Sequence, residues 1–118
     1  MFKFEKLEIW HLANDYADKI YETTKTFPQE EKFNLVDQLK RAANSIPTNI
    51  AEGSGSESVK DFKNFLNISI KSTYETVSLL YRARKRNYIG EETRKKLYGE
   101  AEVLVKRTSA FKKWLINH

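Results

Sequence analysis

The sequence contains no cysteine and only 2 Pro and 4 Gly in 118 residues. Without cysteine there is no disulfide scaffold, no thiolate metal site and no thiol nucleophile. So few prolines and glycines argue against a β-sandwich or barrel, because those folds need many tight turns. The only histidines, His11 and His118, do not have the spacing of a metal-ligand pair. These absences favour a helical protein, and we expect neither a metal nor another cofactor.

Long hydrophobic runs are also missing. The apolar runs are only a few residues long, whereas a membrane span needs about 20. The first six residues, Met-Phe-Lys-Phe-Glu-Lys, have neither the apolar core nor the cleavage site of a secretory signal. We therefore expect a cytoplasmic protein without a membrane segment. Hydrophobic residues make up 40% of the chain, which is enough to form one core, so residues 1–118 are predicted to be a single domain.

Hydrophobic residues recur every three or four positions in four segments, the spacing of one helical face. The segments are residues 7–27, residues 28–46, a segment that begins near Ser58, and a segment that begins near Glu91. Residues 53–56 are expected to form a loop, and residues 87–90 are expected to close the third helix. The pattern predicts an all-α, antiparallel up-and-down four-helix bundle. Pro47 is expected to kink or break the second helix late, since proline removes a backbone hydrogen bond.

The third and fourth segments differ in their patterns. The third is apolar around most of its circumference, so it must be covered on several sides, and we infer self-association. The fourth has a single regular stripe with steps of four and three residues. Its members are Leu97, Ala101, Leu104, Thr108, Phe111 and Leu115.

Positive charge is concentrated in the last third of the chain. The formal net charge is +5, with 21 Lys+Arg against 16 Asp+Glu, and residues 82–118 supply the whole excess. A basic surface of this kind suggests a polyanion such as RNA or DNA. A solvated helix face with surplus lysine is the alternative. The candidate binding residues form two clusters that flank one helix–helix corner, and a stripe further along. They are Arg82, Arg84, Lys85 and Arg86; Arg94, Lys95 and Lys96; and Lys106 and Lys113, which continue the face of Lys95.

Tyr81 and Tyr88 lie among these basic residues and could stack on bases. No set of residues suggests catalysis. Ser45, Asn49 and Ser72 could resemble a nucleophile with helpers, but no histidine or lysine is placed to act as their base. A di-metal site would need Glu-x-x-His pairs, and the sequence has none. We expect no enzymatic activity.

The middle of the chain resembles the bacterial four-helix bundle family, also called the 23S rRNA-intervening sequence (S23) protein family. The resemblance rests on Leu-Glu-Ile-Trp at 7–10, Phe-Pro at 27–28 and Gln-Leu-Lys-Arg-Ala-Ala-Asn-Ser-Ile-Pro-Thr-Asn-Ile-Ala-Glu-Gly at 38–53. It implies a four-helix bundle that assembles as a homopentamer. The family's recurrent polar residues match Arg41, Ser45, Asn49, Glu52, Ser72 and Glu75, which the resemblance implies form a buried hydrogen-bond network around Pro47.

Some members of the family are encoded within insertions in large-subunit ribosomal RNA genes. A related branch, the accessory variability protein of diversity-generating retroelements, is a basic pentamer that binds nucleic acid and a reverse transcriptase. The resemblance and the charge together predict a non-enzymatic homopentameric ring that binds RNA or DNA backbone with little sequence preference. The alternative is a scaffold that binds a protein partner and has no nucleic-acid role.

Overall fold

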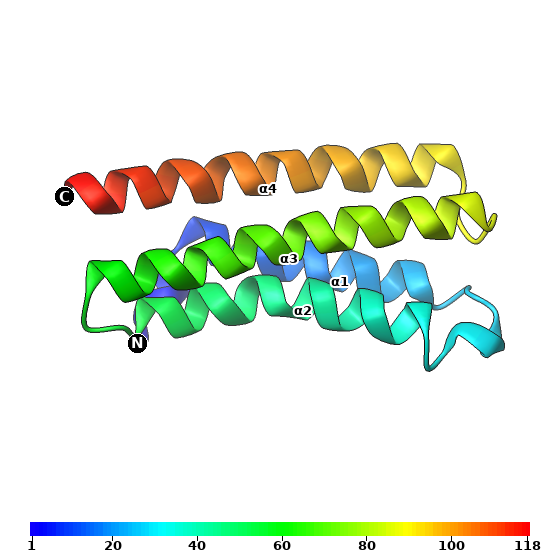
Figure 1. Cartoon of the computed structure of the whole chain (residues 1–118), viewed down its shortest axis with the longest axis horizontal. Helices are drawn as coiled ribbons and strands as arrows, with labels where there is room; N and C mark the ends of the chain where they lie inside the picture. The colour runs from blue at the N-terminus through cyan, green and yellow to red at the C-terminus, as the bar shows by residue number, and fades with distance from the viewer.

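The computed structural model describes all residues, 1–118, as an elongated bundle of four helices with no strands (Figure 1). The helices are α1 (Glu8–Thr24), α2 (Leu35–Ser54), α3 (Val59–Lys85) and α4 (Glu91–Asn117). Short 3₁₀ turns, η1 (Lys3–Lys6) and η2 (Gln29–Glu31), precede α1 and α2. Successive helices run in opposite directions, and the bundle measures 45 × 23 × 21 Å. The predicted all-α, up-and-down four-helix bundle is confirmed. No helix combines the length and the apolar character needed to cross a lipid bilayer.

The periodic apolar residues form the core. In α1, Ile9, Ala13 and Ile20 are buried, and Phe27 is buried just after the helix. The four residues Leu97, Ala101, Leu104 and Thr108 of the α4 stripe are buried as well. Tyr16 joins the two helices, since its hydroxyl donates a hydrogen bond to the backbone carbonyl of Leu97 at 3.1 Å.

The second helix does not begin at Pro28, as the sequence suggested. Pro28 opens the short turn η2, and α2 begins only at Leu35. The reason is the Glu31 carboxylate, which accepts hydrogen bonds from the Asn34 side-chain amide at 2.9 Å and from the Leu35 backbone amide at 3.4 Å. Glu31 thus satisfies donors at the start of α2 and separates it from η2.

Helix α2 does not break at Pro47 but continues to Ser54. Side chains donate hydrogen bonds to the carbonyls around the proline: Thr48 to Asn44 at 2.8 Å, Asn49 to Ser45 at 2.8 Å, and Ser69 of α3 to Ile46 at 3.0 Å. Proline lacks the backbone donor that would bond the Ala43 carbonyl, and these side-chain bonds go to the next three carbonyls along the helix.

Gly53 lies in the last turn of α2, and its assignment to a loop is wrong. It is buried, and a Cβ atom at this position would lie 2.8 Å from both Phe62 Cδ1 and Phe65 Cβ. The glycine therefore allows α2 and α3 to approach closely where they meet. The connection begins after Ser54, and Ser58 caps α3 as predicted, since its hydroxyl accepts the Asp61 backbone amide at 3.1 Å.

Candidate nucleic-acid interface

A hollow of about 510 Å³ lies between the end of α3 and the start of α4. The turn that joins the helices contains Asn87, whose φ of 64° lies in the left-handed region. This turn brings Arg82, Arg84 and Lys85 of α3 to the same hollow as Arg94 of α4. We call this feature, completed by Ser78, Tyr81 and Glu91, the α3–α4 hollow.

Arg94 is held firmly within the hollow. Its guanidinium carbon lies 4.5 Å from the centroid of the Tyr81 ring and 5.7 Å from that of Tyr98, and its Nε donates to the Glu91 carboxylate. This hydrogen bond, followed by the positive charges of Arg94, Arg84 and Lys95, keeps the pKa of Glu91 below its usual range. The only carboxylate of the hollow thus stays ionised and is already paired.

The other cations of the hollow have no carboxylate partner. No ion pair in the structure involves Arg82, Arg84 or Lys85. Arg84 donates from Nη1 to the Asn87 side-chain oxygen at 3.3 Å, whereas its Nε is buried without a hydrogen-bond partner. The hollow therefore presents unpaired positive charge, and the unsatisfied Nε of Arg84 lies beneath its surface.

Arg86 and Tyr88 make a different set of contacts, which the sequence did not reveal. Both bind the buried carboxylate of Glu31: the Tyr88 hydroxyl donates to Oε2 at 2.7 Å and Arg86 Nη1 to the same atom at 3.2 Å. The bond from Tyr88, with those from Leu35 and Asn34, lowers the pKa of Glu31 despite its burial, and the same bond raises the pKa of Tyr88. Tyr88 also packs on Phe27, with ring centroids 5.3 Å apart.

Binding of nucleic acid by Arg86 and Tyr88 stays a prediction, but both side chains are engaged within the chain. Arg86 has its charge matched within the chain, and the Tyr88 hydroxyl and ring are engaged, so neither is free in the way the sequence suggested. Together with Glu31 they fasten η2 to the α3–α4 turn. A possible signal was the position of Glu31 between a proline and a helix start, but a favourable helix-dipole contact explained that position equally well.

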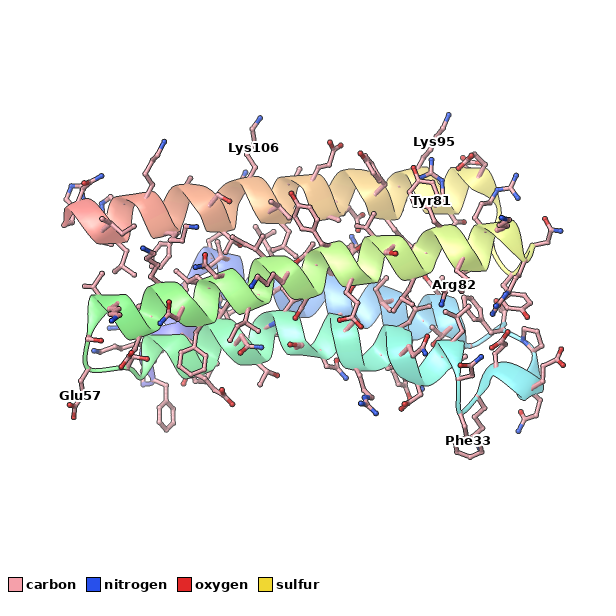
Figure 2. The ribbon with its side chains drawn as sticks, viewed as in Figure 1. Phe33, Glu57, Tyr81, Arg82, Lys95 and Lys106 are labelled. Atoms are coloured by element: carbon pink, nitrogen blue, oxygen red, sulfur yellow. The ribbon has the colours of Figure 1, made fainter.

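The lysines of α4 lie on two sides of that helix. Lys95 and Lys106 both project from its outer edge, away from the other helices (Figure 2). Lys113 is exposed and shares their face by its spacing. Lys96 instead lines a separate groove between α1 and α4 that also contains Asp18 and Glu22. The structure thus separates Lys96 from the hollow and from the outer lysine face.

The polar residues around Pro47 form a smaller group than expected. The Ser72 hydroxyl donates to the Ser45 hydroxyl at 2.8 Å, and the Asn49 amide donates to the same Ser45 oxygen at 2.8 Å. These three residues join α2 to α3, next to the bond from Ser69.

Three members of the expected set are not buried. Arg41, Glu52 and Glu75 are exposed, and Arg41 pairs with Asp37 on its own helix at 3.4 Å. A buried network of all six residues is therefore wrong for the chain taken by itself. Charged side chains of this size need partners inside a core, and the short Ser and Asn side chains already fill the space at the α2–α3 contact.

A second groove, of about 730 Å³, continues along the seam between α3 and α4. It is mainly apolar. Tyr74 is 66% exposed and Val103 is 47% exposed, so the hydrophobic face expected on the third helix is open to solvent in the single chain. The groove is lined by Thr73, Tyr74 and Val77 of α3 and by Tyr98, Ala101 and Val103 of α4.

The structure contains no cluster of three or more His, Asp or Glu side chains that could hold a metal ion. His11 is exposed, and its Nε2 lies 2.8 Å from the backbone carbonyl of Glu5. The largest group of like-charged side chains among these sites is thus the cationic corner of α3 and α4.

Comparison with known proteins agrees with this fold. A crystal structure of a protein of unknown function from the S23 ribosomal protein family of Bacteroides thetaiotaomicron is 25% identical in sequence and superposes with a TM-score of 0.79. The similarity covers 89% of this chain and 98% of that one. No curated protein matches the chain. Residues 5–110 match the family described as 23S rRNA-intervening sequence protein. The chain belongs to the 23S rRNA-intervening sequence protein family.

Proposed function

We propose that this protein is a non-enzymatic, cytoplasmic nucleic-acid-binding protein that contacts the phosphate backbone of RNA or DNA with little sequence preference. The observation that carries the proposal is the unpaired charge of Arg82, Arg84 and Lys85 in the α3–α4 hollow. Lys95 and Lys106 extend the positive surface along the outer edge of α4 (Figure 2). Arg and Lys side chains that bind phosphates supply affinity without reading sequence.

An aromatic residue beside these cations supports binding to single strands. Tyr81 is 53% exposed although Arg94 covers part of its ring. An exposed ring next to a basic hollow can stack on any base, which adds affinity with little sequence preference.

The binding form is proposed to be a homopentameric ring. The open apolar groove along α3 and α4 supports self-association, because a hydrophobic face with Tyr74 and Val103 exposed gains stability when a second copy covers it. Each additional copy contributes a net charge of +5. A ring would thus concentrate positive charge and raise the rate and strength of polyanion binding at low ionic strength.

The test is a salt titration of binding, measured by fluorescence anisotropy on an RNA hairpin and a DNA duplex. Affinity should fall steeply and similarly for both ligands as salt rises. Replacing Arg82, Lys85, Lys95 and Lys106 with Gln should weaken binding to both. The slope of log affinity against log salt should fall by up to about 3 in magnitude, since each lost phosphate contact removes roughly 0.7–0.9.

A matched control removes the same charge from the opposite end of the bundle. Lys3, Lys6, Lys60 and Lys63 are exposed and form no ion pair, so their replacement with Gln should leave most of the affinity intact. Equal losses in the two variants would mean that net charge alone drives binding and that the assigned surface is wrong.

The second candidate function is a scaffold for a protein partner. The apolar α3–α4 groove favours it, as does Phe33, which projects into solvent from the turn before α2 and is 87% exposed (Figure 2). The same titration distinguishes the two functions. A folded, assembled protein that binds neither RNA nor DNA at low salt would contradict the nucleic-acid function and favour the scaffold.

A further inference from the structure

The α3–α4 hollow has an excess of positive charge that a backbone-tracking surface does not require. Four cationic side chains surround it, and its single carboxylate, Glu91, is already bound to Arg94. A groove that follows a strand usually spreads its charges along the path of the backbone. Here Arg82, Arg84 and Lys85 instead line one shallow, open hollow beside the helix–helix turn. This concentration suits one highly charged group more than a line of singly charged ones.

Several hydrogen-bond donors of the hollow also have no acceptor within the chain. The guanidinium of Arg84 makes one long hydrogen bond, to Asn87, and its Nε, which lies beneath the surface of the hollow, has no acceptor. Arg82 and Lys85 donate to no side chain or backbone group of the chain, and the Ser78 hydroxyl lies in the same lining. An anion with several acceptor oxygens would satisfy these groups together.

Tyr81 forms the remaining wall. Arg94 stacks on its ring at 4.5 Å and fixes its orientation, while about half of the side chain stays open to solvent. A planar group attached to a bound anion would therefore find a preorganised aromatic surface next to the charge.

We propose that the α3–α4 hollow binds a phosphomonoester, the terminal phosphate of a nucleic-acid strand, with the terminal base against Tyr81. This inference rests on the proposed nucleic-acid function and refines it. A phosphomonoester carries nearly two negative charges and three terminal oxygens near neutral pH, whereas a backbone diester carries one charge and two such oxygens. The monoester thus suits the excess charge of the hollow and offers more acceptor oxygens to Arg82, Arg84 and Lys85 than a diester does.

The test compares one short single-stranded RNA that carries either a 5′-phosphate or a 5′-hydroxyl, with the fluorophore at its 3′ end. Anisotropy at fixed salt should show about tenfold tighter binding of the phosphorylated strand, the effect of one or two charge-assisted hydrogen bonds. Arg84→Gln, and independently the double variant Arg82→Gln/Lys85→Gln, should weaken the binding of both strands and bring their affinities to the same value, so that the preference for phosphate is lost. Circular dichroism establishes that each variant is folded. Lys113→Gln removes one exposed charge outside the hollow and should keep the preference.

A second arm separates the sources of the phosphate by titrating uridine 5′-monophosphate against uridine. Binding of the monophosphate without binding of either RNA would support the hollow as a phosphomonoester site for small molecules and contradict the nucleic-acid function. Equal affinity for the two RNAs would overturn the inference while the backbone-binding function stands. No preference for phosphate in either arm would overturn the inference as well.

Discussion

At the scale of single residues, Glu31 has the most demanding environment in the chain. Its carboxylate is buried at the end of the bundle, and it accepts hydrogen bonds from Tyr88, Arg86, Asn34 and the Leu35 backbone. A buried carboxylate is stable only when its charge and its lone pairs are matched in this way. Glu31 thus connects η2, the start of α2 and the α3–α4 turn, and it also determines that Arg86 does not contribute to the open hollow.

We predict that Glu31→Gln lowers the melting temperature of the protein and makes that temperature less sensitive to acid pH. Folding lowers the pKa of Glu31, so its contribution is present above the ordinary glutamate pKa of about 4.3 and is lost as the pH falls through the lowered value. Melting followed by circular dichroism between neutral pH and pH ~3 measures both effects. The exposed neighbour variant Glu30→Gln is the control. An unchanged melting temperature and acid profile in Glu31→Gln would contradict the assignment.

Residue-scale features of this kind were only partly readable in the sequence. The Ser58 cap was predicted correctly, because the hydroxyl and its acceptor amide lie within one helical turn. Glu31 was missed, because its partners Arg86 and Tyr88 follow more than fifty positions later and only the folded chain brings them together. The burial expected for Arg41, Glu52 and Glu75 came from the resemblance to the family, and in the single chain these three side chains are exposed.

At the scale of helices, the contact between α2 and α3 depends on the small side chain of Gly53. We predict that Gly53→Ala destabilises the protein by about 1–3 kcal/mol, because the new methyl group would overlap Phe62 and Phe65 and force them to move. Gly99→Ala in α4 is the matched control, since no atom lies within 4 Å of its added Cβ. That substitution should stabilise its helix by up to about 1 kcal/mol. Chemical denaturation of both variants measures whether each substitution lowers or raises the free energy of unfolding. A neutral or stabilising Gly53→Ala would refute the close approach of α2 and α3.

The helix boundaries show where the local hydrophobic pattern is sufficient to predict a helix and where it is not. The segments that became α1, α3 and α4 were predicted from their hydrophobic spacing and turn residues. The predicted start of α2 was wrong, since the helix begins at Leu35, where the Glu31 carboxylate accepts the Leu35 backbone amide. The helix continues past Pro47 to Ser54, and Gly53, which was assigned to the loop, lies in its last turn. Gly53 packs on Phe62 and Phe65 of α3, a contact that the local pattern does not show.

At the scale of the whole molecule, the seam between α3 and α4 has a basic part and an apolar part. The α3–α4 hollow is basic, and the adjoining groove is apolar and open around Tyr74 and Val103. The sequence predicted both features, the first from the charge of residues 82–118 and the second from the apolar circumference of the third helix. Spacing could not show that Lys96 faces α1 or that Arg86 binds Glu31, because the rotation of each side chain about its helix depends on packing.

The assembly proposal predicts that Val103→Glu converts the protein to monomers. Light scattering of the unmodified protein should give five times the chain mass of 13.9 kDa. A carboxylate at Val103 would replace an apolar side chain in the groove and lie beside Glu102 and Lys106, so covering this face would require the removal of water from a charge. Val59→Glu is the matched control, since Val59 has a similar exposure of 46% but lies at the far end of α3, outside the groove.

The same variant tests whether assembly strengthens nucleic-acid binding. A monomeric Val103→Glu retains the α3–α4 hollow but loses the simultaneous contacts of several copies with one strand. Its affinity for a long RNA should therefore fall by about 100-fold or more, whereas its affinity for a strand too short to reach two hollows should change little. A monomeric mass for the unmodified protein would contradict self-association. An unmodified mass of another multiple would refute the pentamer. An assembled Val103→Glu would show that the interface lies elsewhere than the apolar groove.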